Sequence, residues 1–331
     1  MRTQFIPLSD EYRLSLAEYM HKVYPSFTKE YIDYNINEGI LGNQESYSSF
    51  IVLDNNKNVV GCHLSFCTKA WIHGKEVPVV WGHDTYLDSE YRREIGLDFM
   101  LEIATIKNGF GLGLSDVNVK IQKKMRSAML IDGVRKYCII SPWILWRKCQ
   151  TFFNVSPKLP ILPSMIRIGN NTIIQCKTPE DISIPNNGYW NKDICEVDFV
   201  RDKDFLNKRF FHNPVHTYTV YTIKGESCYF VLRPILFKGM PALMLADFRY
   251  EYAGPLFVHT MNKVIIKLCH MYKFGAILFI TNDNHLKDML NGSKVYYKSY
   301  PVAFVGGKKF LTSKDSFVLL SAADSDDEFH K

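Results

Sequence analysis

The spacing of apolar residues in the first part of the chain predicts two helices followed by an antiparallel meander. Apolar positions recur at helical spacing over 10–24 and again over 28–37, as they do on the buried face of a helix. Three runs rich in β-branched and aromatic residues follow, and turn sequences separate them. These runs predict strands over 48–54, 59–72 and 76–88.

The third of these strands is interrupted and leads directly into a helix. Its alternation of apolar and polar residues breaks around Gly82, which predicts a β-bulge. A helix is predicted over 89–107, a buried strand over 109–117 and a basic amphipathic helix over 118–130. Short strands are then predicted over 137–140 and 144–147.

A proline-rich stretch divides the chain into two predicted lobes. Prolines interrupt the pattern repeatedly over 154–185, so we expect this stretch to connect a lobe at 1–153 with a lobe at 186–331. The second half repeats the order of the first: a helix, an antiparallel meander, a helix, a strand, a helix and strands. We therefore expect an α/β (α+β) protein of two tandem lobes, each a mixed, mostly antiparallel sheet flanked by helices. In the second lobe we predict helices over 202–211, 255–273 and 285–291 and strands over 216–223, 227–237, 242–250, 275–281, 301–306 and 316–322.

Composition narrows the classes of function. With 47% apolar and 22% charged residues, the chain has the make-up of a globular protein. It has no run of about 18 apolar residues and no apolar signal core, so we expect no membrane insertion and a cytoplasmic location. The 8 cysteines are scattered singly without a CxxC pair, which predicts reduced thiols and no metal site. A net charge of +6 suits a small polyanionic ligand better than a nucleic acid.

The segment over 80–98 is the clearest candidate for chemistry. A strand ends, a basic turn follows and a helix starts at once. Backbone amides in the first turn of a helix have no partner within the helix, and the helix dipole adds partial positive charge, so such a junction binds anions. Arg92 and Arg93 lie beside it, and Gly96 lets a ligand approach the backbone. We expect a pyrophosphate there.

The run Arg93-Glu-Ile-Gly96-Leu-Asp98 resembles the acyl-CoA motif of the GCN5-related N-acetyltransferase superfamily. That motif has Gln or Arg, two further residues, Gly, one residue, and then Gly or Ala. The chain matches the first two anchors and departs from the pattern at Asp98. The flanks also match, because a meander precedes the motif and a strand followed by a helix from Asn118 comes after it. The resemblance implies that each lobe has the fold of this superfamily.

The resemblance also implies how acyl-CoA, as co-substrate, would bind. In this superfamily the strand before the motif splays from the next strand, and the pantetheine arm pairs with it in the gap. Asn118 would face the coenzyme from the following strand–helix junction. Backbone groups of Thr85, Tyr86 and Leu87 would pair with pantetheine. The amides of Arg93, Glu94, Ile95, Gly96 and Leu97 would hold the pyrophosphate, with Arg92 beside them.

Over its whole length the chain is similar to two-lobed members of the superfamily. One group of these are sugar-nucleotide N-acyltransferases of bacterial surface polysaccharide pathways, which supply lipopolysaccharide and O-antigen. They transfer a short acyl group, acetyl or hydroxybutanoyl, from coenzyme A to the amine of a dTDP-linked 3-amino-3,6-dideoxyhexose. The resemblance thus implies acyl-CoA and a nucleotide-linked amino sugar as partners, without metal or nucleic acid. A monomer and a dimer both remain open.

Acyl transfer to an amine needs a base, because a primary amine is mostly protonated near neutral pH. His83 and Asp84 precede the residues expected to pair with pantetheine, and Asp116 lies near the end of the neighbouring predicted strand. We take these three as candidate bases. Strand alternation places the side chains of His83 and Asp84 on opposite faces, unless the bulge reorients them.

Candidates for binding the sugar nucleotide lie in the second lobe. Arg209 suits a diphosphate, and His212 suits a sugar hydroxyl. Asp247 lies near the end of the strand at which a matching splay of the second lobe would occur. We expect these three side chains to contact the sugar nucleotide.

Two alternatives to sugar-nucleotide acylation remain. The first is a two-lobed peptidyl transferase that uses aminoacyl-tRNA, which should have a stronger basic surface or a protruding helical arm. The second is a non-catalytic interaction module in which Asp98 marks a spoiled site. Binding and turnover of acyl-CoA would separate the three hypotheses.

Overall fold

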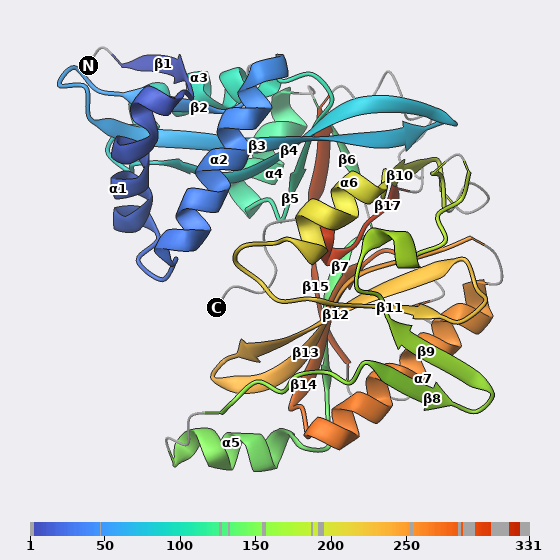
Figure 1. The fold of residues 1–331 in the computed structure, drawn as a ribbon. Helices are drawn as coiled ribbons and strands as arrows, with labels where there is room; N and C mark the ends of the chain where they lie inside the picture. Colours follow the sequence, from blue (N-terminus) through green and yellow to red (C-terminus); the bar gives the residue numbers. More distant parts are fainter. Residues whose placement is uncertain are drawn as a thin grey trace. The chain divides into compact units, whose positions relative to one another are not determined.

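The computed structural model divides the chain into two compact units (Figure 1). The first unit holds Met1–Asp132 and Pro301–Ser316, and the second holds Gly133–Tyr300 and Phe317–Lys331. The structure describes residues 3–46, 48–125, 128–131, 133–153, 157–186, 188–190, 195–251, 254–283, 286, 295–305 and 318–324.

The first unit is built on one mixed sheet with the strand order β1-β2-β3-β4-β5-β16-β6. Neighbouring strands run antiparallel except β4 and β5, which run parallel. The long hairpin of β3 and β4 turns at His73 and Gly74, whose φ angles of 48° and 73° are left-handed. The strands are β1 (Gln4–Pro7), β2 (Phe50–Leu53), β3 (Val59–Ile72), β4 (Lys75–Leu87), β5 (Gly109–Leu112), β6 (Ala128–Ile131) and β16 (Val302–Val305).

Helices cover both faces of this first sheet. Along β2, Ile51 and Leu53 are buried together with α1 and α2, whereas Phe50 and Val52 are buried together with α3. Successive side chains of a strand point to opposite faces, so this alternation requires an apolar cover on each side. The helices are a 3₁₀ turn (Asp10–Tyr12), α1 (Arg13–Val23), α2 (Lys29–Ser46), α3 (Arg92–Thr105) and α4 (Asp116–Met125).

The second unit repeats the mixed-sheet plan with the strand order β15-β7-β14-β13-β12-β11-β9-β8. Its parallel neighbours are β13 and β14, and its other neighbours run antiparallel. The short strands β10 and β17 pair with each other in parallel. The strands are β7 (Arg135–Ile140), β8 (Met165–Ile168), β9 (Asn171–Gln175), β10 (Val197–Phe199), β11 (Thr219–Ile223), β12 (Cys228–Phe237), β13 (Met240–Tyr250), β14 (Ala276–Thr281), β15 (Val295–Ser299) and β17 (Val318–Leu319).

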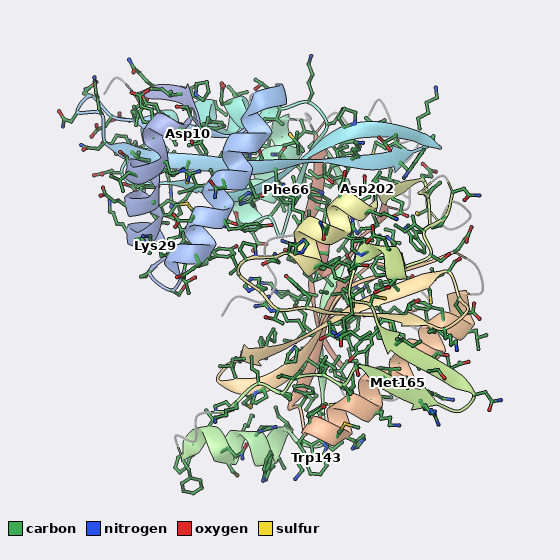
Figure 2. All side chains as sticks on the ribbon, in the orientation of Figure 1. Asp10, Lys29, Phe66, Trp143, Met165 and Asp202 are labelled. Atoms are coloured by element: carbon green, nitrogen blue, oxygen red, sulfur yellow. The ribbon has the colours of Figure 1, made fainter. Side chains whose placement is uncertain are left out.

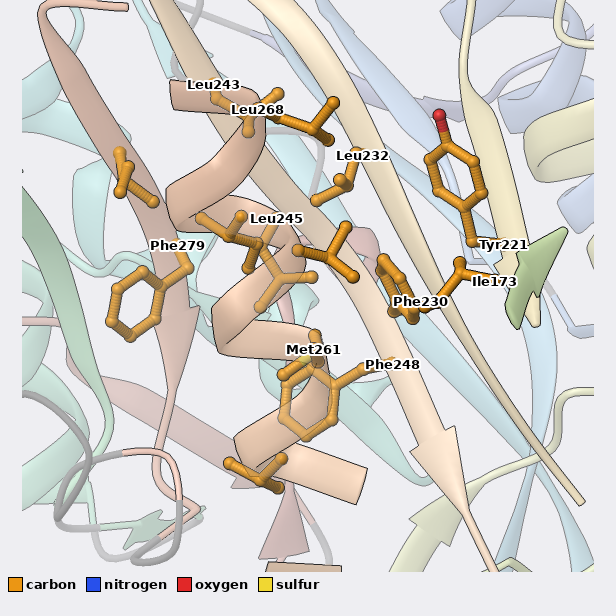
Figure 3. Close-up of a cluster of buried hydrophobic side chains, with 14 of the residues drawn as sticks. Ile173, Tyr221, Phe230, Leu232, Leu243, Leu245, Phe248, Met261, Leu268 and Phe279 are labelled. Atoms are coloured by element: carbon orange, nitrogen blue, oxygen red, sulfur yellow. The ribbon is translucent and has the colours of Figure 1, made fainter. Parts of the chain in front are cut away.

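The long helix α7 covers one face of the second sheet with an apolar stripe (Figure 3). Val258, Met261 and Leu268 recur at helical spacing and are fully buried. Figure 3 shows Met261 and Leu268 among side chains of the sheet that include Leu245 and Phe230. The helices of this unit are α5 (Ile144–Phe152), α6 (Lys203–Leu206), a π-helical turn (Asn207–Phe211), α7 (Gly254–Tyr272) and 3₁₀ turns at Pro179–Asp181 and Ala322–Asp324.

Each half of the chain contributes one strand to the sheet of the other half. β16, from the later half, lies between β5 and β6, where Phe304 stacks on Phe110 with ring centroids 3.9 Å apart. β7, from the earlier half, lies between β14 and β15, where Tyr137 stacks on Phe279 with centroids 4.9 Å apart. This exchange explains why the first unit is not continuous in sequence.

The predicted class, a mixed α/β fold with two sheets flanked by helices, is confirmed, but the two units divide the chain differently from the predicted lobes. The segment 133–153 lies in the second unit, because β7 pairs with β14. The stretch 154–185, predicted as a connection, includes β8 and β9, which pair with each other and extend the second sheet through β11. The prolines therefore lie before and after these two strands and do not mark a connection between two domains.

Some predicted elements also differ in type or length. Residues 144–147, predicted as a strand, begin helix α5. A short apolar run fits the period of a strand and that of a helix equally well, so its own pattern does not determine its structure. Helix-forming residues such as Lys148 and Gln150 follow it and favour the helix. The strand predicted over 109–117 ends at Leu112, and α4 begins at Asp116. The helix predicted over 285–291 lies outside the described residues, apart from residue 286.

Candidate active site

The two parallel strands of the first sheet separate beyond Gly82. Their pairing sets Val80–Gly82 of β4 opposite Gly109–Gly111 of β5 and stops there. β4 continues to Leu87, whereas β5 ends at Leu112. β4 therefore extends past its parallel neighbour, which agrees with the splay that the resemblance implies.

A β-bulge lies just beyond the last paired residue. Asp84 and Thr85 together oppose His63 on β3, and Asp84 has a left-handed φ of 40°. A non-glycine residue with this φ is strained, so its neighbours must hold it in place. The bulge lies slightly beyond the predicted position at Gly82. It brings the side chains of His83 and Asp84 together, although strict alternation would place them on opposite faces.

His83 and Asp84 form a buried polar pair. Nδ1 of His83 lies 3.2 Å from Oδ2 of Asp84, and the two side chains expose only 3% and 6% of their surface. Asn35 on α2 donates from Nδ2 to the same carboxylate oxygen at 2.5 Å. A carboxylate held in this way favours the histidine tautomer with the proton on Nδ1, which leaves Nε2 as the basic nitrogen. Asn35 was absent from the predicted site, because one polar residue on a helix gives no sequence signal.

A second histidine supports the bulge from β3. Nδ1 of His63 lies 2.7 Å from Oγ1 of Thr85. The ring packs over Gly82, where an added Cβ would lie 2.8 Å from Cε1 of His63. Burial first, and the charge of His83 second, lower the pKa of His63 to about 3. His63 is therefore uncharged near neutral pH. His63 was not among the predicted site residues, because its only signal in the sequence is a polar residue within a largely apolar strand.

Helix α3 begins three residues later than the predicted start at residue 89. Its first residue is Arg92, and the amides of Glu94 and Ile95 donate to the carbonyl of Tyr91 at 3.1 and 3.0 Å. The anion-binding capacity of a helix start resides in the amides that precede these internal bonds. The structure therefore centres the candidate anion site on the amides of Arg92 and Arg93.

Gly96 and Leu97 lie in the second turn of α3. Their amides are internal to the helix, so they do not fit the predicted role of holding a pyrophosphate. Among the described atoms, a Cβ added to Gly96 would meet only Cβ of Arg92, at 4.0 Å. The packing of the fold thus does not require glycine at position 96. Leu97 and Asp98 are exposed on the same turn.

The loop between β4 and α3 is fixed from both ends. Nε of Arg92 donates to the carbonyl of Leu87 at 2.7 Å, and its guanidinium lies 5.1 Å from the ring centre of Tyr86. The hydroxyl of Tyr19 on α1 donates to Asp88 in the loop at 3.1 Å. These contacts set the direction in which the start of α3 faces.

Asp116 begins α4 instead of ending a strand, and Asn118, predicted at the start of this helix, lies in its first turn. The side chain of Asp116 is exposed and makes no hydrogen bond or ion pair with His83 or Asp84, both of which the structure describes. The amide of Asn118 donates to Oγ of Ser115 at 3.3 Å. The structure therefore brings His83 and Asp84 together but does not add Asp116 to them.

Arg209 and His212 lie on one turn of the second unit. Arg209 belongs to the π-helical turn and is half-buried, whereas His212 follows the turn and is exposed. The amide of His212 donates to the carbonyl of Asn207 at 2.7 Å, which ends the turn. A shared contact of these two side chains with a ligand stays a prediction.

Asp247 is fully buried in a network of ion pairs within the second unit. Its oxygens accept hydrogen bonds from Arg201 at 2.8 Å, Arg249 at 2.9 Å, Tyr229 at 2.6 Å and Ser321 at 2.6 Å. A carboxylate with four protein donors and no exposed surface does not fit the predicted contact with a sugar nucleotide. Asp247 instead ties together strands and turns of the second unit.

Two further carboxyl groups complete this network. Nε of Arg249 donates to Asp198 at 3.0 Å, and Arg201 donates to Asp324. Burial alone would raise the pKa of Asp247, but Arg201 and Arg249 hold it below its usual value. Burial raises the pKa of Asp198 despite the same arginines. The sequence does not reveal the network, because its members come from segments far apart in the chain.

The thiol nearest the buried pair is not a nucleophile. Sγ of Cys62 donates to the carbonyl of Asp84 at 3.4 Å. Burial, with the neighbouring charge of Asp84, raises the pKa of this thiol well above its usual value. Cys62 therefore stays protonated, and a covalent acyl-cysteine step finds no support at this site.

Comparisons with known proteins identify the fold. No family model and no curated protein matches the sequence. A conserved protein of unknown function from Enterococcus faecalis, named as a probable N-acyltransferase, has a TM-score of 0.56 at 11% identity over 94% of this chain and 74% of its own. A GCN5-related N-acetyltransferase from Anabaena variabilis has a TM-score of 0.58 at 12% identity, over 91% and 72% of the two chains.

A third similar structure is N-myristoyltransferase of Saccharomyces cerevisiae with bound myristoyl-CoA and inhibitors. Its TM-score is 0.56 at 12% identity, over 92% of this chain and 79% of its own. At these identities the likeness establishes the fold alone. The chain therefore has the two-lobed fold seen in structures of GCN5-related N-acetyltransferases, as the motif suggested.

Two features of other protein classes are missing from the described part of the chain. None of its helices combines the length and the apolar character that a bilayer crossing needs. Within the same residues, no three His, Cys, Asp or Glu side chains are grouped as ligands of a metal ion.

Proposed function

We propose that the protein is an acyl-CoA-dependent N-acyltransferase whose reaction centre is the splay of the first unit. The observation that supports this most is the bulge at Asp84, which joins His83, Asp84 and Asn35 in one buried chain beside the separated strands. A strained bulge and a buried histidine–carboxylate pair are costly for a fold. Their joint presence beyond the end of the parallel pairing therefore supports a functional role for this part of β4.

His83 is the proposed base. The acceptor amine must lose a proton before it attacks the thioester carbonyl, and Nε2 of His83 accepts that proton while Asp84 holds Nδ1–H. The amine nitrogen then bonds to the acyl carbon, the carbon–sulfur bond breaks, and the thiolate leaves. Thiols have a pKa of about 8.5, so this leaving group needs little assistance. Because His83 and Asp84 are almost fully buried, the acceptor amine has to enter the site as far as strand β4.

The coenzyme is proposed to lie along β4 toward the start of α3. Tyr86 and Leu87 pair with β3 on one edge of β4, and the β5 side of this stretch is left for the pantetheine arm. The first-turn amides of Arg92 and Arg93 would receive the pyrophosphate. The exposed guanidinium of Arg93 would add charge at the same place.

The proposed acceptor is the amine of a nucleotide-linked (dTDP) amino-deoxy sugar, and the acyl group is acetyl or hydroxybutanoyl. The sequence resemblance to two-lobed sugar-nucleotide acyltransferases supports this finer proposal. Arg209 and His212 remain its candidate contacts for the diphosphate and the sugar, and Asp247 is withdrawn because it is buried and fully bonded. A panel of amine acceptors, from amino sugars to peptides with a free N-terminus, would establish the acceptor class.

The decisive test measures amine-dependent release of thiol from acetyl-CoA. The wild type should release thiol, and His83→Gln should reduce the rate at least about a hundredfold, because it removes the base but keeps a hydrogen-bonding side chain. His21→Gln is the matched control, since His21 is an exposed histidine of the same unit. Full activity of His83→Gln would contradict the proposed base. Failure of the wild type to bind any acyl-CoA would favour the interaction-module alternative.

A further inference from the structure

We propose that helix α5 is an interfacial anchor that binds the surface of an anionic phospholipid membrane. The helix presents its apolar side chains to solvent. Leu145, Cys149, Phe152 and Phe153 recur at the spacing of one helical face. Leu145, Phe152 and Phe153 are 73%, 81% and 73% exposed, and Trp146 beside them is 42% exposed. Helix α5 buries none of its residues.

The opposite face of α5 attaches the helix to the second unit. Nε of Arg147 donates to the carbonyl of Lys273 and Nη2 to that of Tyr272, both at 2.7 Å, which satisfies backbone oxygens at the end of α7. Ile144 and Arg147 also pack where a Cβ on Gly275 would lie 3.5 Å from each. A surface helix normally buries its apolar stripe and exposes its charges. α5 instead exposes its apolar stripe together with Lys148, while Arg147 attaches the helix to the unit, so the stripe has no apolar partner among the described residues.

The chain segments that include α5 and its neighbouring elements carry basic residues over long stretches without Asp or Glu. Residues 133–179 contain seven Lys and Arg and no Asp or Glu, and 227–246 and 252–282, from the neighbouring elements, also lack Asp and Glu. Nζ of Lys273 lies 5.4 and 4.9 Å from the ring centres of Trp143 and Trp146. Figure 2 shows Trp143 at the start of α5, at the margin of the second unit.

This combination selects an anionic lipid surface among possible occupants. Interfacial helices join an apolar face with Trp and Phe to Lys and Arg that meet lipid phosphates. A second copy docked face to face would bring the same cationic patch against itself, without carboxylates to pair with it. A nucleic acid would contact the basic residues but would not provide an apolar environment for the exposed rings of Phe152 and Phe153. With nine residues, α5 is too short to cross a bilayer, so the contact is at the surface.

The test is flotation of the full chain with lipid vesicles, without acyl-CoA, so that the outcome is independent of the proposed transferase activity. One set of vesicles is phosphatidylcholine, and the other is equal parts phosphatidylcholine and phosphatidylglycerol. We expect binding to the anionic vesicles, weakened by added salt, together with a blue shift of tryptophan fluorescence. Phe152→Ser combined with Phe153→Ser should reduce binding about tenfold or more, since each ring loses its apolar environment.

Matched variants separate the patch from general surface effects. Leu256→Ser combined with Ile266→Ser removes exposed apolar side chains of α7 in the same unit and should leave binding unchanged. Lys148→Glu combined with Lys273→Glu should reduce binding to anionic vesicles at least about twentyfold, because each lost charge is worth about fivefold. Circular dichroism of each variant confirms that it is folded.

Three results would overturn the proposal. The first is a wild type that does not float with anionic vesicles, or that binds both kinds of vesicle equally at high salt. The second is undiminished binding by the Phe152/Phe153 variant. The third is a patch-dependent dimer in analytical ultracentrifugation, or patch-dependent retention of RNA, without vesicle binding.

Discussion

The two sheets contain the same local construction and use it in opposite ways. In the first sheet, parallel pairing ends at Gly82 and a bulge follows at Asp84. In the second, parallel pairing of β13 with β14 ends at Leu245, and a register shift against β12 leaves Ala246 as an extra residue. A helix follows each of the two strands, α3 after β4 and α7 after β13.

The difference lies in what fills the space beyond the bulge. In the first unit, a neutral histidine, a histidine–aspartate pair and one asparagine occupy it, and the following helix begins with exposed arginines. In the second unit, Asp247 and Arg249 point into a closed ion network with no exposed surface. The same arrangement of strands therefore holds a candidate reaction centre in one unit and a buried ion network that stabilises the fold in the other. Polar side chains, not backbone topology, decide between the two uses.

The largest expected effect is on activity in the first splay. Asp84→Asn should reduce acyl transfer about 10²–10⁴-fold, because an amide no longer holds the productive tautomer of His83. The measurement is the initial rate of thiol release at saturating acetyl-CoA. Glu18→Gln, an exposed carboxylate change on α1, should leave the rate as it is. A rate for Asp84→Asn within a factor of two of the wild type would contradict the proposed catalytic role of the first splay.

A comparable effect on stability is expected in the second splay. Asp247→Ala should lower the free energy of unfolding by about 3–5 kcal/mol, because it leaves two buried guanidiniums without a carboxylate between them. Urea unfolding followed by fluorescence measures the change, with Glu226→Ala as the exposed control in the same unit. The folded fraction should keep its affinity for CoA. A small stability loss together with lost CoA binding would mean that the two splays have been assigned in reverse.

A smaller effect concerns the pH dependence of stability through His63. Burial lowers the pKa of His63 to about 3, below the usual value of about 6.5, so the fold favours the neutral form. The resulting stabilisation is complete above about pH 6.5 and is lost as the pH falls toward 3. From pH 7 to pH 5 the wild type should lose about 2 kcal/mol more than His63→Gln, which cannot titrate. If the free energy of unfolding of the wild type and of His63→Gln fell by the same amount from pH 7 to pH 5, the lowered pKa of His63 would be contradicted.

The smallest effect separates packing from ligand binding at position 96. Gly96→Ala should stabilise the fold by about 0.5–1 kcal/mol, because the site is helical and open. The same change should leave CoA affinity within about twofold, because the amide of Gly96 is internal to the helix and the candidate anion site lies at Arg92 and Arg93. A roughly tenfold weaker affinity would instead place the coenzyme against position 96. Thermal unfolding and calorimetric titration of CoA measure the two quantities. Unchanged CoA affinity would show that the motif glycine is not part of the coenzyme site.

The sequence correctly predicted the elements in which apolar residues recur with one clear period, either that of a strand or that of a helix. The meander and α7 combine long runs with a clear face, so their existence and type were predicted correctly. α5 was predicted as a strand, because its first residues form a short apolar run that fits either period. The exchange of β7 and β16 was missed, since strand partners far apart in sequence leave no local pattern.

The candidate site was predictable only where its members are neighbours in sequence. His83, Asp84 and Arg92 stand within one segment, and the break in alternation pointed to the bulge. Asn35 and His63 reach the site from α2 and β3, and only tertiary packing brings them there. Asp247 was misassigned because a polar residue at a strand end has the same sequence signature whether it meets a ligand or two buried arginines.

The strand exchange also governs how this protein can be made. While the ribosome is still translating the later half, the first sheet has an open edge at β5, and β6 lacks the neighbour that joins it to the sheet. The first unit closes only after Val302–Val305 has emerged, and the ion network of the second needs Ser321 and Asp324. Both units are therefore complete only once 302–324 has been synthesised. Until then the nascent chain presents an unpaired strand edge, a surface that favours wrong pairing with other strands.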